Sequence, residues 1–333
     1  MGTTAPPPIL AADAAGIEAA AAVLHRGGIV GLPTETVYGL AGDALRAEVV
    51  TRIFATKGRP PDNPLIVHLA DERGLDQLVG EITPLARALV RDYWPGPLTL
   101  VLDASPAVPP ITRGGLTTVA VRVPDHPVAS RLLATSSLAL AAPSANPSGR
   151  PSPTRPEHVV AGLGAGVDLV LDGGPCTIGV ESTVVDARGR WPVVLRDGLV
   201  SREELGVVGQ GQGPQQHRSP GTRYAHYTPR CSVEIVTGPT QLGARLRACL
   251  AAGERVGVVA DAASLAALRS GDAPGVVDYT VRADDEVALA RSLYGAFLGA
   301  EDAAVDRLLV MAVPERGVGR AVMDRLRRAA AGG

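Results

Sequence analysis

The stretch that decides the fold is GLPTETVYGL at residues 31–40, followed by KGRPPDNPLIVH at residues 57–68. Each half combines a short apolar run, typical of a buried strand, with a polar turn that contains proline. Between the halves, residues 47–56 have the spacing of a helix, which Gly58 ends and the following prolines keep from resuming. Polar residues at strand ends are where α/β proteins bind ligands, so this stretch also predicts a site.

The same alternation of helix and strand patterns continues on both sides. Residues 1–205 are predicted to contain helices at 13–26, 47–56, 84–93 and 156–162, and strands at 29–32, 64–69, 98–102, 118–123, 138–142, 167–171, 182–186 and 193–196. Mixed connections of this kind predict an α/β domain with a twisted, partly antiparallel sheet.

A second domain is predicted after a linker. Residues 206–219, GVVGQGQGPQQHRS, have few apolar residues and no periodicity, so residues 206–230 are assigned to a linker. Residues 231–333 then alternate strands at 233–236, 256–260 and 307–313 with helices at 240–252, 262–269, 286–300 and 319–330. This spacing favours a small α/β domain with a parallel, Rossmann-like sheet.

Composition excludes several classes of protein. The chain has 333 residues, 46% of them hydrophobic, and a net charge of −2, so it is not a polycation that binds RNA by bulk charge. Its three cysteines lie far apart, which argues against a disulfide framework or a zinc site and favours a reducing cytoplasm. No apolar run approaches the roughly 20 residues of a membrane span, and the start MGTTAPPP lacks the basic residues of a signal peptide. We expect a cytoplasmic protein without a membrane partner.

One basic residue stands apart. Among 32 basic residues only Lys57 is a lysine, so a general drift from lysine to arginine has spared this position. An ammonium group is a compact charge, whereas a guanidinium group is a broad plane, so a site shaped for one rejects the other. Chance survival is the alternative interpretation.

Familiar nucleotide and hydrolase motifs are absent from the sequence: there is no G-x-x-x-x-G-K-[ST], no correctly spaced G-x-G-x-x-G, no nucleophile elbow and no H-E-x-x-H. The cations Lys57 and Arg59 suit a polyphosphate, although capping of a helix C-terminus would also place charge there. His68 is equally well interpreted as a core histidine. Arg122 shares a strand face with Thr118 and suits a carboxylate, unless it is an edge-strand charge.

Taken together, the motifs are specific. In chain order they are PTETVYGL, KGRPPDNPLIVH, AVRVP, APSANPSG, ESTVVD and VLRDG. This set resembles the YrdC-like threonylcarbamoyl-AMP synthase family, and SPGTRYAHYTP with GVGRAVMDRLRRAA resembles its two-domain form, over residues 10–330. Arg223 stands where relatives often have lysine.

The resemblance implies an enzyme that joins L-threonine, bicarbonate or CO2, and ATP into threonylcarbamoyl-AMP and releases pyrophosphate, with Mg²⁺ accompanying ATP. A downstream tRNA threonylcarbamoyl transferase would use the product on the adenosine beside the anticodon, and weak binding of tRNA is possible. The resemblance implies that Lys57 and Arg59 are catalytic. It implies that threonine binds to Thr36, His68, Arg122, Ala142 and Ser182, and that the nucleotide binds to Arg59, Asn63, Thr118, Ser144, Ser152, Arg196 and Tyr227. No metal site built from protein ligands is expected, and residues 219–229 are expected to fold across the site.

Two other readings remain open at this stage. A double-stranded RNA or tRNA-binding module without catalysis is one, although the weak net charge and few aromatic residues argue against it. A carbamoyl-transfer protein of the hydrogenase-maturation type is the other, but the acylphosphatase and zinc-finger segments of that class are absent from the sequence. The second domain could be a nucleotide sensor or a scaffold.

Overall fold

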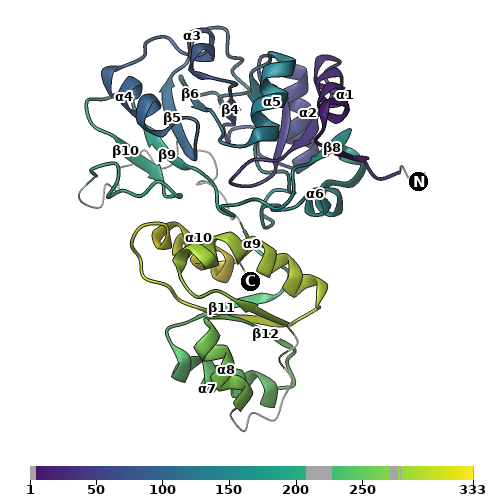
Figure 1. The fold of residues 1–333 in the computed structure, drawn as a ribbon, viewed down its shortest axis with the longest axis vertical. Coiled ribbons are helices and arrows are strands. Elements are labelled where there is room, and N and C mark those ends of the chain that lie inside the picture. Colours follow the sequence, from purple (N-terminus) through teal and green to yellow (C-terminus); the bar gives the residue numbers. More distant parts are fainter. Residues whose placement is uncertain (1–4, 208–226, 271–276, 278, 333) are drawn as a thin grey trace. The chain divides into compact units, whose positions relative to one another are not determined.

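The computed structural model describes residues 5–207, 227–270, 277 and 279–332, and these belong to two compact units (Figure 1). Unit 1 consists of Met1–Ser148 and Ser152–Tyr224, and unit 2 consists of Gly149–Pro151 and Ala225–Gly333. Gly149–Pro151 fall inside the predicted first domain, residues 1–205, but belong to unit 2, which the sequence did not predict. The linker predicted at residues 206–230 lies mostly outside the described residues, so its bounds stay a prediction.

Unit 1 contains a ten-stranded mixed sheet with the strand order β1-β8-β2-β3-β7-β4-β6-β5-β9-β10. Its strands are β1 (Ile9–Ala11), β2 (Val30–Leu32), β3 (Gly39–Asp43), β4 (Ile66–His68), β5 (Leu98–Asp103), β6 (Thr118–Arg122), β7 (Leu140–Ala141), β8 (Leu169–Asp172), β9 (Thr183–Asp186) and β10 (Val193–Arg196). β4 pairs parallel with β6, whereas β7 pairs antiparallel with both β3 and β4. The predicted mixed α/β sheet is confirmed.

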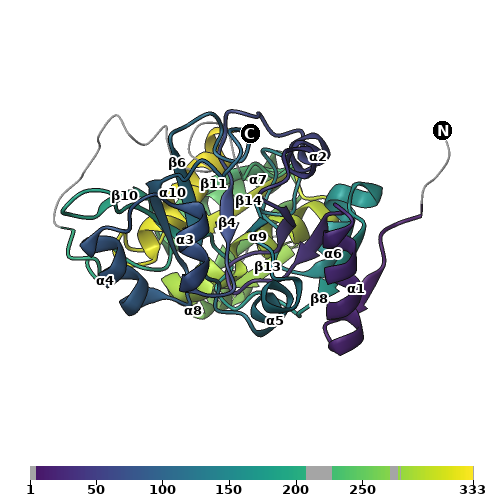
Figure 2. The same ribbon diagram turned by 90° about the horizontal axis from the view of Figure 1, so that it is seen from above.

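The two faces of this sheet are covered differently. One face carries the main core, into which the helices α2 (Ala47–Lys57), α3 (Leu75–Leu78), α4 (Pro84–Tyr93) and α6 (Pro156–Leu163) insert their apolar side chains. On the other face α1 (Ala14–His25) and α5 (Pro127–Ser136) lie side by side and cover the half of the sheet from β8 to β7 (Figures 1 and 2). The short 3-10 helices η1 (Glu72–Gly74) and η2 (Gly164–Gly166) complete unit 1.

The remaining half of that second face has a cluster of its own. Five buried residues form it, all of them on strands: Ile66, Val101, Ala120, Val184 and Leu195. No helix side chain described for unit 1 belongs to this cluster. The strands from β4 to β10 therefore carry a second buried apolar cluster, here called the apolar floor, on the half of this face that α1 and α5 do not reach.

Local sequence explains why α2 ends where the polar stretch begins. Val49, Val50, Ile53 and Phe54 are buried at helical spacing and attach α2 to the main core. Gly58 follows with φ +59°, a left-handed conformation that glycine adopts without strain, and its N–H caps the helix. Lys57 is thereby fixed as the last residue of a firmly packed helix.

Several elements were not predicted from the sequence. β3 reads GLAGD, and its two glycines have low strand propensity, but burial and antiparallel pairing with β2 outweigh that preference. α5 begins with Pro127 after the His126 side chain, which caps its N-terminus by accepting from Val128 N. β1, α3 and β13 were also missed, and each is only three or four residues long.

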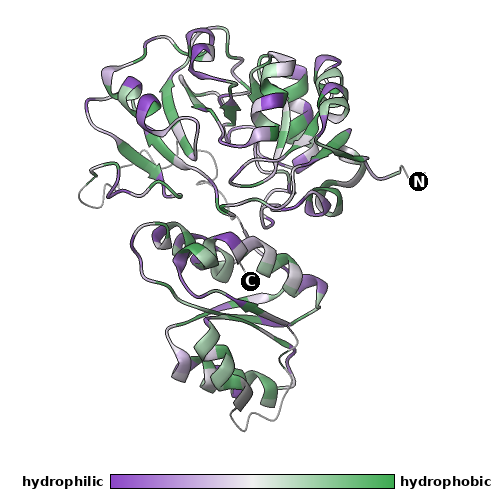
Figure 3. Ribbon diagram, in the orientation of Figure 1, coloured by the Kyte–Doolittle hydropathy of each residue, from purple (hydrophilic) through white to green (hydrophobic). Residues whose placement is uncertain are grey.

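Unit 2 is a small parallel α/β layer structure, as predicted. Its sheet has the order β11-β14-β12-β13, and every pairing in it is parallel. The strands are β11 (Ser232–Val236), β12 (Val256–Ala260), β13 (Tyr279–Arg282) and β14 (Arg307–Met311). Helices α7 (Pro239–Ala251) and α8 (Ala262–Ser270) cover one face, and α9 (Glu286–Asp302) and α10 (Gly319–Ala331) cover the other (Figure 1). Figure 3 shows hydrophobic residues concentrated on the strands of both sheets.

The core of α2 predicts a specific cost. Ile53→Ala removes a side chain that is 0% exposed, so we expect unit 1 to lose about 2–5 kcal/mol of stability. The measurement is urea unfolding followed by tryptophan fluorescence, because both tryptophans, Trp94 and Trp191, lie in unit 1. Thr51→Ala, at an exposed position of the same helix, is the control and should stay within about 0.5 kcal/mol of the parent. Equal effects of the two substitutions would contradict this packing.

Candidate active site

β6 sets the dimensions of the site. Every second side chain of a strand lies on the same face, so β6 places Thr118, Ala120 and Arg122 on the face that holds the apolar floor. Thr118 and Arg122 are four residues apart, which corresponds to about 13 Å along an extended strand. Ala120, between them, is small and 4% exposed. The strand therefore separates two polar ends by a short apolar surface.

At the carboxyl end of β6, the Arg122 guanidinium is buried and held by two other segments, the turn after α4 and the PTET turn. Its Nε donates to Gly96 O at 3.0 Å, and its Nη1 donates to Thr36 Oγ1 at 3.0 Å. Its Nη2 lies 2.5 Å from Glu35 Oε1. His68 is beside Arg122, because these two residues are paired in the parallel register of β4 and β6. Arg122 is 3% exposed, so it is not an edge-strand charge.

Backbone hydrogen bonds bring the 176–182 loop to the same place. Ile178 N donates to Glu35 O at 2.9 Å, and Gly179 N donates to Thr36 O at 3.1 Å. Thr183 N donates to Pro97 O, next to the Gly96 carbonyl that receives Arg122. The PTET turn, the turn after α4 and the loop before β9 therefore converge on the end of β6.

Ser182 and Arg196 form the next group. Arg196 donates from Nη2 to Ser182 O at 2.9 Å and to Ser182 Oγ at 3.1 Å, and Ser182 Oγ also lies 2.8 Å from Thr99 Oγ1. One residue earlier, Glu181 accepts a hydrogen bond from Ser152 Oγ at 2.7 Å. These contacts place Ser152, Ser182 and Arg196 in one network with the loop that contacts the PTET turn.

At the other end, Lys57 shapes the APSANPSG loop. Its Nζ donates to the carbonyl oxygens of Ser144, at 2.5 Å, and of Asn146, and its own carbonyl accepts from Ser148 N. Lys57 is 3% exposed, and burial, with a smaller effect of the Arg59 charge, lowers the pKa of its ammonium well below the usual value. Such a compact pair of contacts suits an ammonium and not a guanidinium.

Arg59 and Asn63 stand close to Lys57 in the chain and line the start of β4. Arg59 donates from Nε to Asn63 O at 3.2 Å and from Nη2 to Pro64 O at 2.9 Å. Asn63 is fully buried, and Thr118, at the start of the neighbouring β6, is 5% exposed. Ser144 is joined to this region through the contact of its carbonyl with Lys57, and it forms a bridge with Gly39.

The predicted residues thus fall into two groups within unit 1. The first group lies at the carboxyl ends of β4 and β6 and consists of Thr36, His68, Arg122 and Ser182, with Ser152 and Arg196 in the Ser182 network. The second group lies at the amino ends of these two strands and consists of Lys57, Arg59, Asn63, Thr118 and Ser144. Ala142 lies between them, because its N–H donates to Ile66 O in the middle of the sheet.

Tyr227 is placed differently, within unit 2. Its ring stacks on Tyr294 with 5.5 Å between the ring centroids, and the Arg325 guanidinium lies 5.6 Å from its ring centroid. Tyr227 is 5% exposed and has φ +71°. The structure therefore packs this ring among side chains of unit 2, and the rest of the segment predicted to cover the site, residues 219–226, lies outside the described residues.

At the Arg122 end of the site, several buried polar atoms lack hydrogen-bond partners among the described residues. Glu35 Oε2, Arg122 Nη2 and His68 Nδ1 are all buried, and among the described residues none of these atoms has a hydrogen-bond partner. Burial, reinforced by the Arg122 charge, lowers the pKa of His68 to about 3, so its imidazole is neutral at ordinary pH. Buried polar atoms without partners are costly, so such a group of them indicates a polar ligand.

Sequence reasoning missed two carboxylates in this region. Glu35 pairs with Arg122, and Glu181 accepts from Ser152. Both stand inside quoted motifs, but their partners are distant in the chain, so only the tertiary structure identifies them. Burial raises the pKa of Glu35, but the Arg122 charge and the Asp125 N–H outweigh burial and hold this pKa below its usual value.

No protein-built metal site is found in the described part of the chain, since it contains no group of three or more His, Cys, Asp or Glu side chains with suitable geometry. The described helices also include none that is long and apolar enough to cross a membrane.

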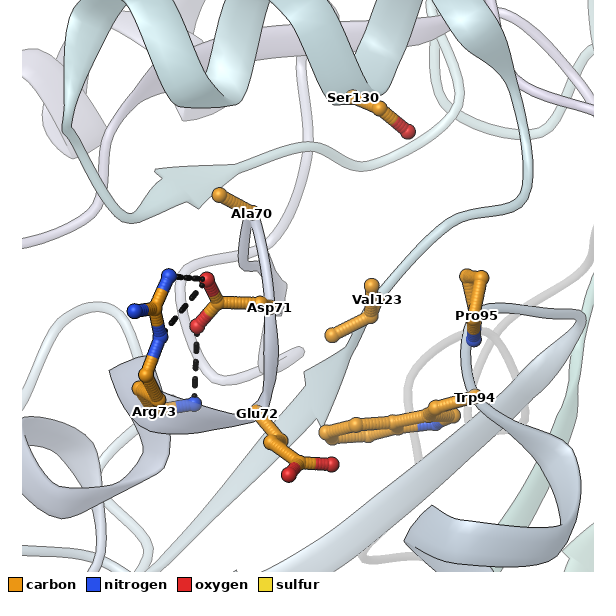
Figure 4. Close-up of a pocket in the computed structure, with 8 residues that line it drawn as sticks. All are labelled: Ala70, Asp71, Glu72, Arg73, Trp94, Pro95, Val123 and Ser130. Atoms are coloured by element: carbon orange, nitrogen blue, oxygen red, sulfur yellow. Dashed lines mark hydrogen bonds and ion pairs between the residues drawn. The ribbon is translucent and has the colours of Figure 1, made fainter.

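A separate pocket lies beyond the carboxyl ends of β4 and β6 (Figure 4). It has a volume of about 270 Å³ and is lined by Ala70, Asp71, Glu72, Arg73, Trp94, Pro95, Val123 and Ser130. Asp71 and Arg73 in it are paired with one another, and the Trp94 indole N–H donates to Leu98 O. None of the predicted site residues lines this pocket.

Comparisons with known proteins identify the family. Residues 22–198 match the Sua5, YciO and YrdC family model, described as telomere recombination, and residues 200–331 match the model described as threonylcarbamoyl-AMP synthase, C-terminal domain. The threonylcarbamoyl-AMP synthase of Bacillus subtilis is 40% identical, with 95% of this chain and 93% of the relative covered. That of Pyrococcus abyssi is 42% identical, with 94% and 93% covered.

A solved structure gives the same result. The crystal structure of P. abyssi Sua5 complexed with L-threonine matches with a TM-score of 0.86 and 40% identity, covering 95% of this chain and 94% of that one. A two-domain α/β enzyme with a polar site along one sheet face is thus the class of protein. The chain belongs to the Sua5/YrdC family of threonylcarbamoyl-AMP synthases.

The buried His68 predicts a pH dependence of stability. Its folded pKa of about 3 lies below the unfolded value of 6.5, so below pH 6.5 the unfolded state binds a proton that the folded state does not. Between pH 7.5 and pH 5.0 this residue alone should remove about 2 kcal/mol of stability. His68→Asn should therefore lose that much less than the parent over this interval, in urea unfolding followed by tryptophan fluorescence.

The same substitution at His25, an exposed residue, is the control and should not change the pH dependence. If the parent and His68→Asn lost equal stability on acidification, the buried neutral imidazole would be contradicted.

Proposed function

We propose that this protein is an L-threonylcarbamoyladenylate synthase, which converts L-threonine, bicarbonate or CO2, and ATP into threonylcarbamoyl-AMP and pyrophosphate. The names of the full-length relatives support this proposal. The observation that carries it is the arrangement along β6. Buried polar atoms without hydrogen-bond partners among the described residues surround Arg122 at one end, and the basic loop held by Lys57 lies at the other end, about 13 Å away.

The Arg122 end suits threonine. A free amino acid brings a carboxylate for the Arg122 guanidinium, and threonine adds a hydroxyl that can bond to the neutral imidazole of His68 or to Thr36 Oγ1. Ser182 and the backbone at Ala142 are proposed to complete this subsite. Both lie beside the strands that hold Arg122 and His68.

The opposite end suits the nucleotide. We assign Lys57 and Arg59 to the phosphates, with Lys57 acting partly through the loop that it holds. The remaining nucleotide contacts within unit 1 are assigned to Asn63, Thr118, Ser144, Ser152 and Arg196. The contact predicted for Tyr227, which belongs to unit 2, stays a prediction. Ser152 and Arg196 belong to the network around Ser182, next to the threonine subsite, which is consistent with a nucleotide whose α-phosphate approaches the amino acid.

The proposed chemistry needs positioning more than acid or base groups. The threonine amine attacks CO2 to give a carbamate, and a carbamate oxygen then attacks the α-phosphorus while pyrophosphate leaves. If bicarbonate is the source, water is lost in the first step. Bringing these anions together requires charge compensation, which the cations at the start of β4 supply.

Mg²⁺ is assigned to the substrate and not to the protein. This ion commonly binds one or two carboxylates together with substrate phosphates and water, and the described residues offer no cluster of ligands near Lys57 that would hold it alone. It would enter with ATP, and no step above depends on a protein ligand for it.

The product would pass to a tRNA threonylcarbamoyl transferase in the cytoplasm, and direct binding of tRNA stays a prediction. The alternative of an RNA-binding module without catalysis is not supported, because the relatives that match the full chain are named as synthases.

The activity has a direct test. Pyrophosphate release from ATP should require L-threonine and bicarbonate together and should not require RNA. Omission of either small substrate should abolish release, and L-serine should be used less well, by about 1–3 kcal/mol of discrimination for one methyl group. Release that depends on RNA, or that ignores threonine, would contradict the proposed function.

Lys57→Arg tests the basic end. The charge is kept, but the guanidinium cannot reproduce the close contacts to the two loop carbonyls, so we expect a loss of about tenfold or more in adenylate formation. Overpacking at this buried position should also cost about 1–3 kcal/mol of stability. Arg91→Lys, on the exposed side of α4, is the control for an arginine and lysine exchange. Parent-like turnover in Lys57→Arg would contradict the assignment.

A further inference from the structure

Glu35 is a buried charged group at the site that the proposed function leaves without a part in substrate binding. It lies in the turn between β2 and β3 and is 5% exposed. Its Oε1 accepts from Asp125 N at 3.0 Å and lies 2.5 Å from Arg122 Nη2. Its Oε2 is buried as well, but within the described residues it has no hydrogen-bond partner. The two oxygens of one carboxylate are therefore in different situations.

The ion pair with Arg122 does not account for the second oxygen. A buried carboxylate oxygen without a donor is costly, and a buried pair is favourable only when its remaining hydrogen-bonding groups are satisfied. Arg122 Nη2 is likewise without a hydrogen-bond partner among the described residues. Glu35 Oε2 is thus an acceptor without a donor, beside a guanidinium whose Nη2 has no hydrogen-bond partner beyond the ion pair with Oε1. One ligand that brings a donor to Oε2 and an acceptor to the guanidinium would satisfy both groups.

The charges of the cluster define that ligand further. Glu35 carries a negative charge, Arg122 carries a positive charge, and the His68 imidazole is neutral. Their sum is zero, so the cluster matches a ligand with no net charge that carries two oppositely charged groups on one carbon atom. A zwitterionic α-amino acid fits this description. A hydroxy acid or another simple carboxylate would place an uncompensated negative charge beside Glu35.

We propose that Glu35 is the residue that recognises the amine of the amino-acid substrate, with Oε2 accepting from the ammonium while Oε1 holds Arg122 in place for the carboxylate. This inference rests on the proposed function and deepens it. It makes the site selective for amino acids over the corresponding hydroxy acids.

The same placement has a consequence for the reaction. When the ammonium becomes a carbamate, a nitrogen–carbon bond forms to CO2 and the nitrogen loses two protons to solvent, so its substituent changes from cationic to anionic. The attraction to Glu35 then becomes a repulsion. The new carboxylate is therefore repelled by Glu35.

The test compares two ligands that differ only in the amine. L-Threonine and (R)-3-hydroxybutanoate share the carboxylate and the hydroxyl, and their affinities are measured by calorimetry, the second by displacement where it is weak. In Glu35→Gln we expect the Kd for threonine to rise about tenfold or more, since a hydrogen bond to a charged group is lost. The Kd for (R)-3-hydroxybutanoate should stay the same or fall, because a repulsive charge is removed.

Asp186→Asn is the matched control. Asp186 is also buried and also pairs with an arginine, Arg188, but it lies at the far end of β9. Its substitution should leave both affinities within about twofold of the parent, since the charge removed is remote from the ligand. If Glu35→Gln fails to fold, Glu35→Asp is the second variant, because it keeps the charge but shortens the side chain by one methylene. In this variant the affinity for threonine should fall, whereas the affinity for (R)-3-hydroxybutanoate should not.

The outcomes separate this inference from the proposed function. Equal losses for both ligands in Glu35→Gln would mean that Glu35 acts only through Arg122, and unchanged affinity for threonine would mean that it does not act in binding. Either result overturns the inference and leaves the synthase assignment intact. If the parent protein released pyrophosphate without needing threonine, the proposed function itself would fail.

Discussion

The site depends on one buried guanidinium. Arg122 has lost nearly all contact with solvent, and such a charge is tolerated only where protein groups replace water. Those groups come from two separate segments: Gly96 O in the turn after α4, and Thr36 Oγ1 with the Glu35 carboxylate in the PTET turn. The loop before β9 is attached to the PTET turn by backbone hydrogen bonds. The need to compensate one charge thereby fixes four parts of the chain around the end of β6.

The rest of the fold makes room for this arrangement. α1 and α5 cover only half of one sheet face, and the strands from β4 to β10 leave the apolar floor on the other half. Because β6 runs across that floor, it separates the amino-acid end from the basic end by a fixed length. The strict alternation of side chains keeps Thr118 and Arg122 on the same face, so a substrate that spans both ends lies along a single strand.

The sequence predicted the fold class and most of the elements, because burial patterns and turn residues are local signals. It also named residues from separate motifs that the structure brings to the two ends of β6, and their roles stay a proposal. It predicted that Lys57 is special, and the contacts of its ammonium with two loop carbonyls give a physical reason for keeping a lysine there. It could not predict β3, because antiparallel pairing with β2 outweighs the low strand propensity of its two glycines. It also could not predict the pairing of Glu35 with Arg122, because these residues are distant in the chain. The sequence also did not predict that Tyr227 stacks on Tyr294 in unit 2, because nothing in the linker sequence indicates the partner of this ring.

The most direct test of the central claim is a crystal structure of this protein with L-threonine and a nonhydrolysable ATP analogue. The account predicts that the threonine carboxylate lies within hydrogen-bond distance of Arg122, that Arg122 keeps its contacts with Gly96 O and Thr36, and that the triphosphate lies toward Lys57 and Arg59. A threonine bound away from Arg122, or a nucleotide bound on a different face of the sheet, would contradict it.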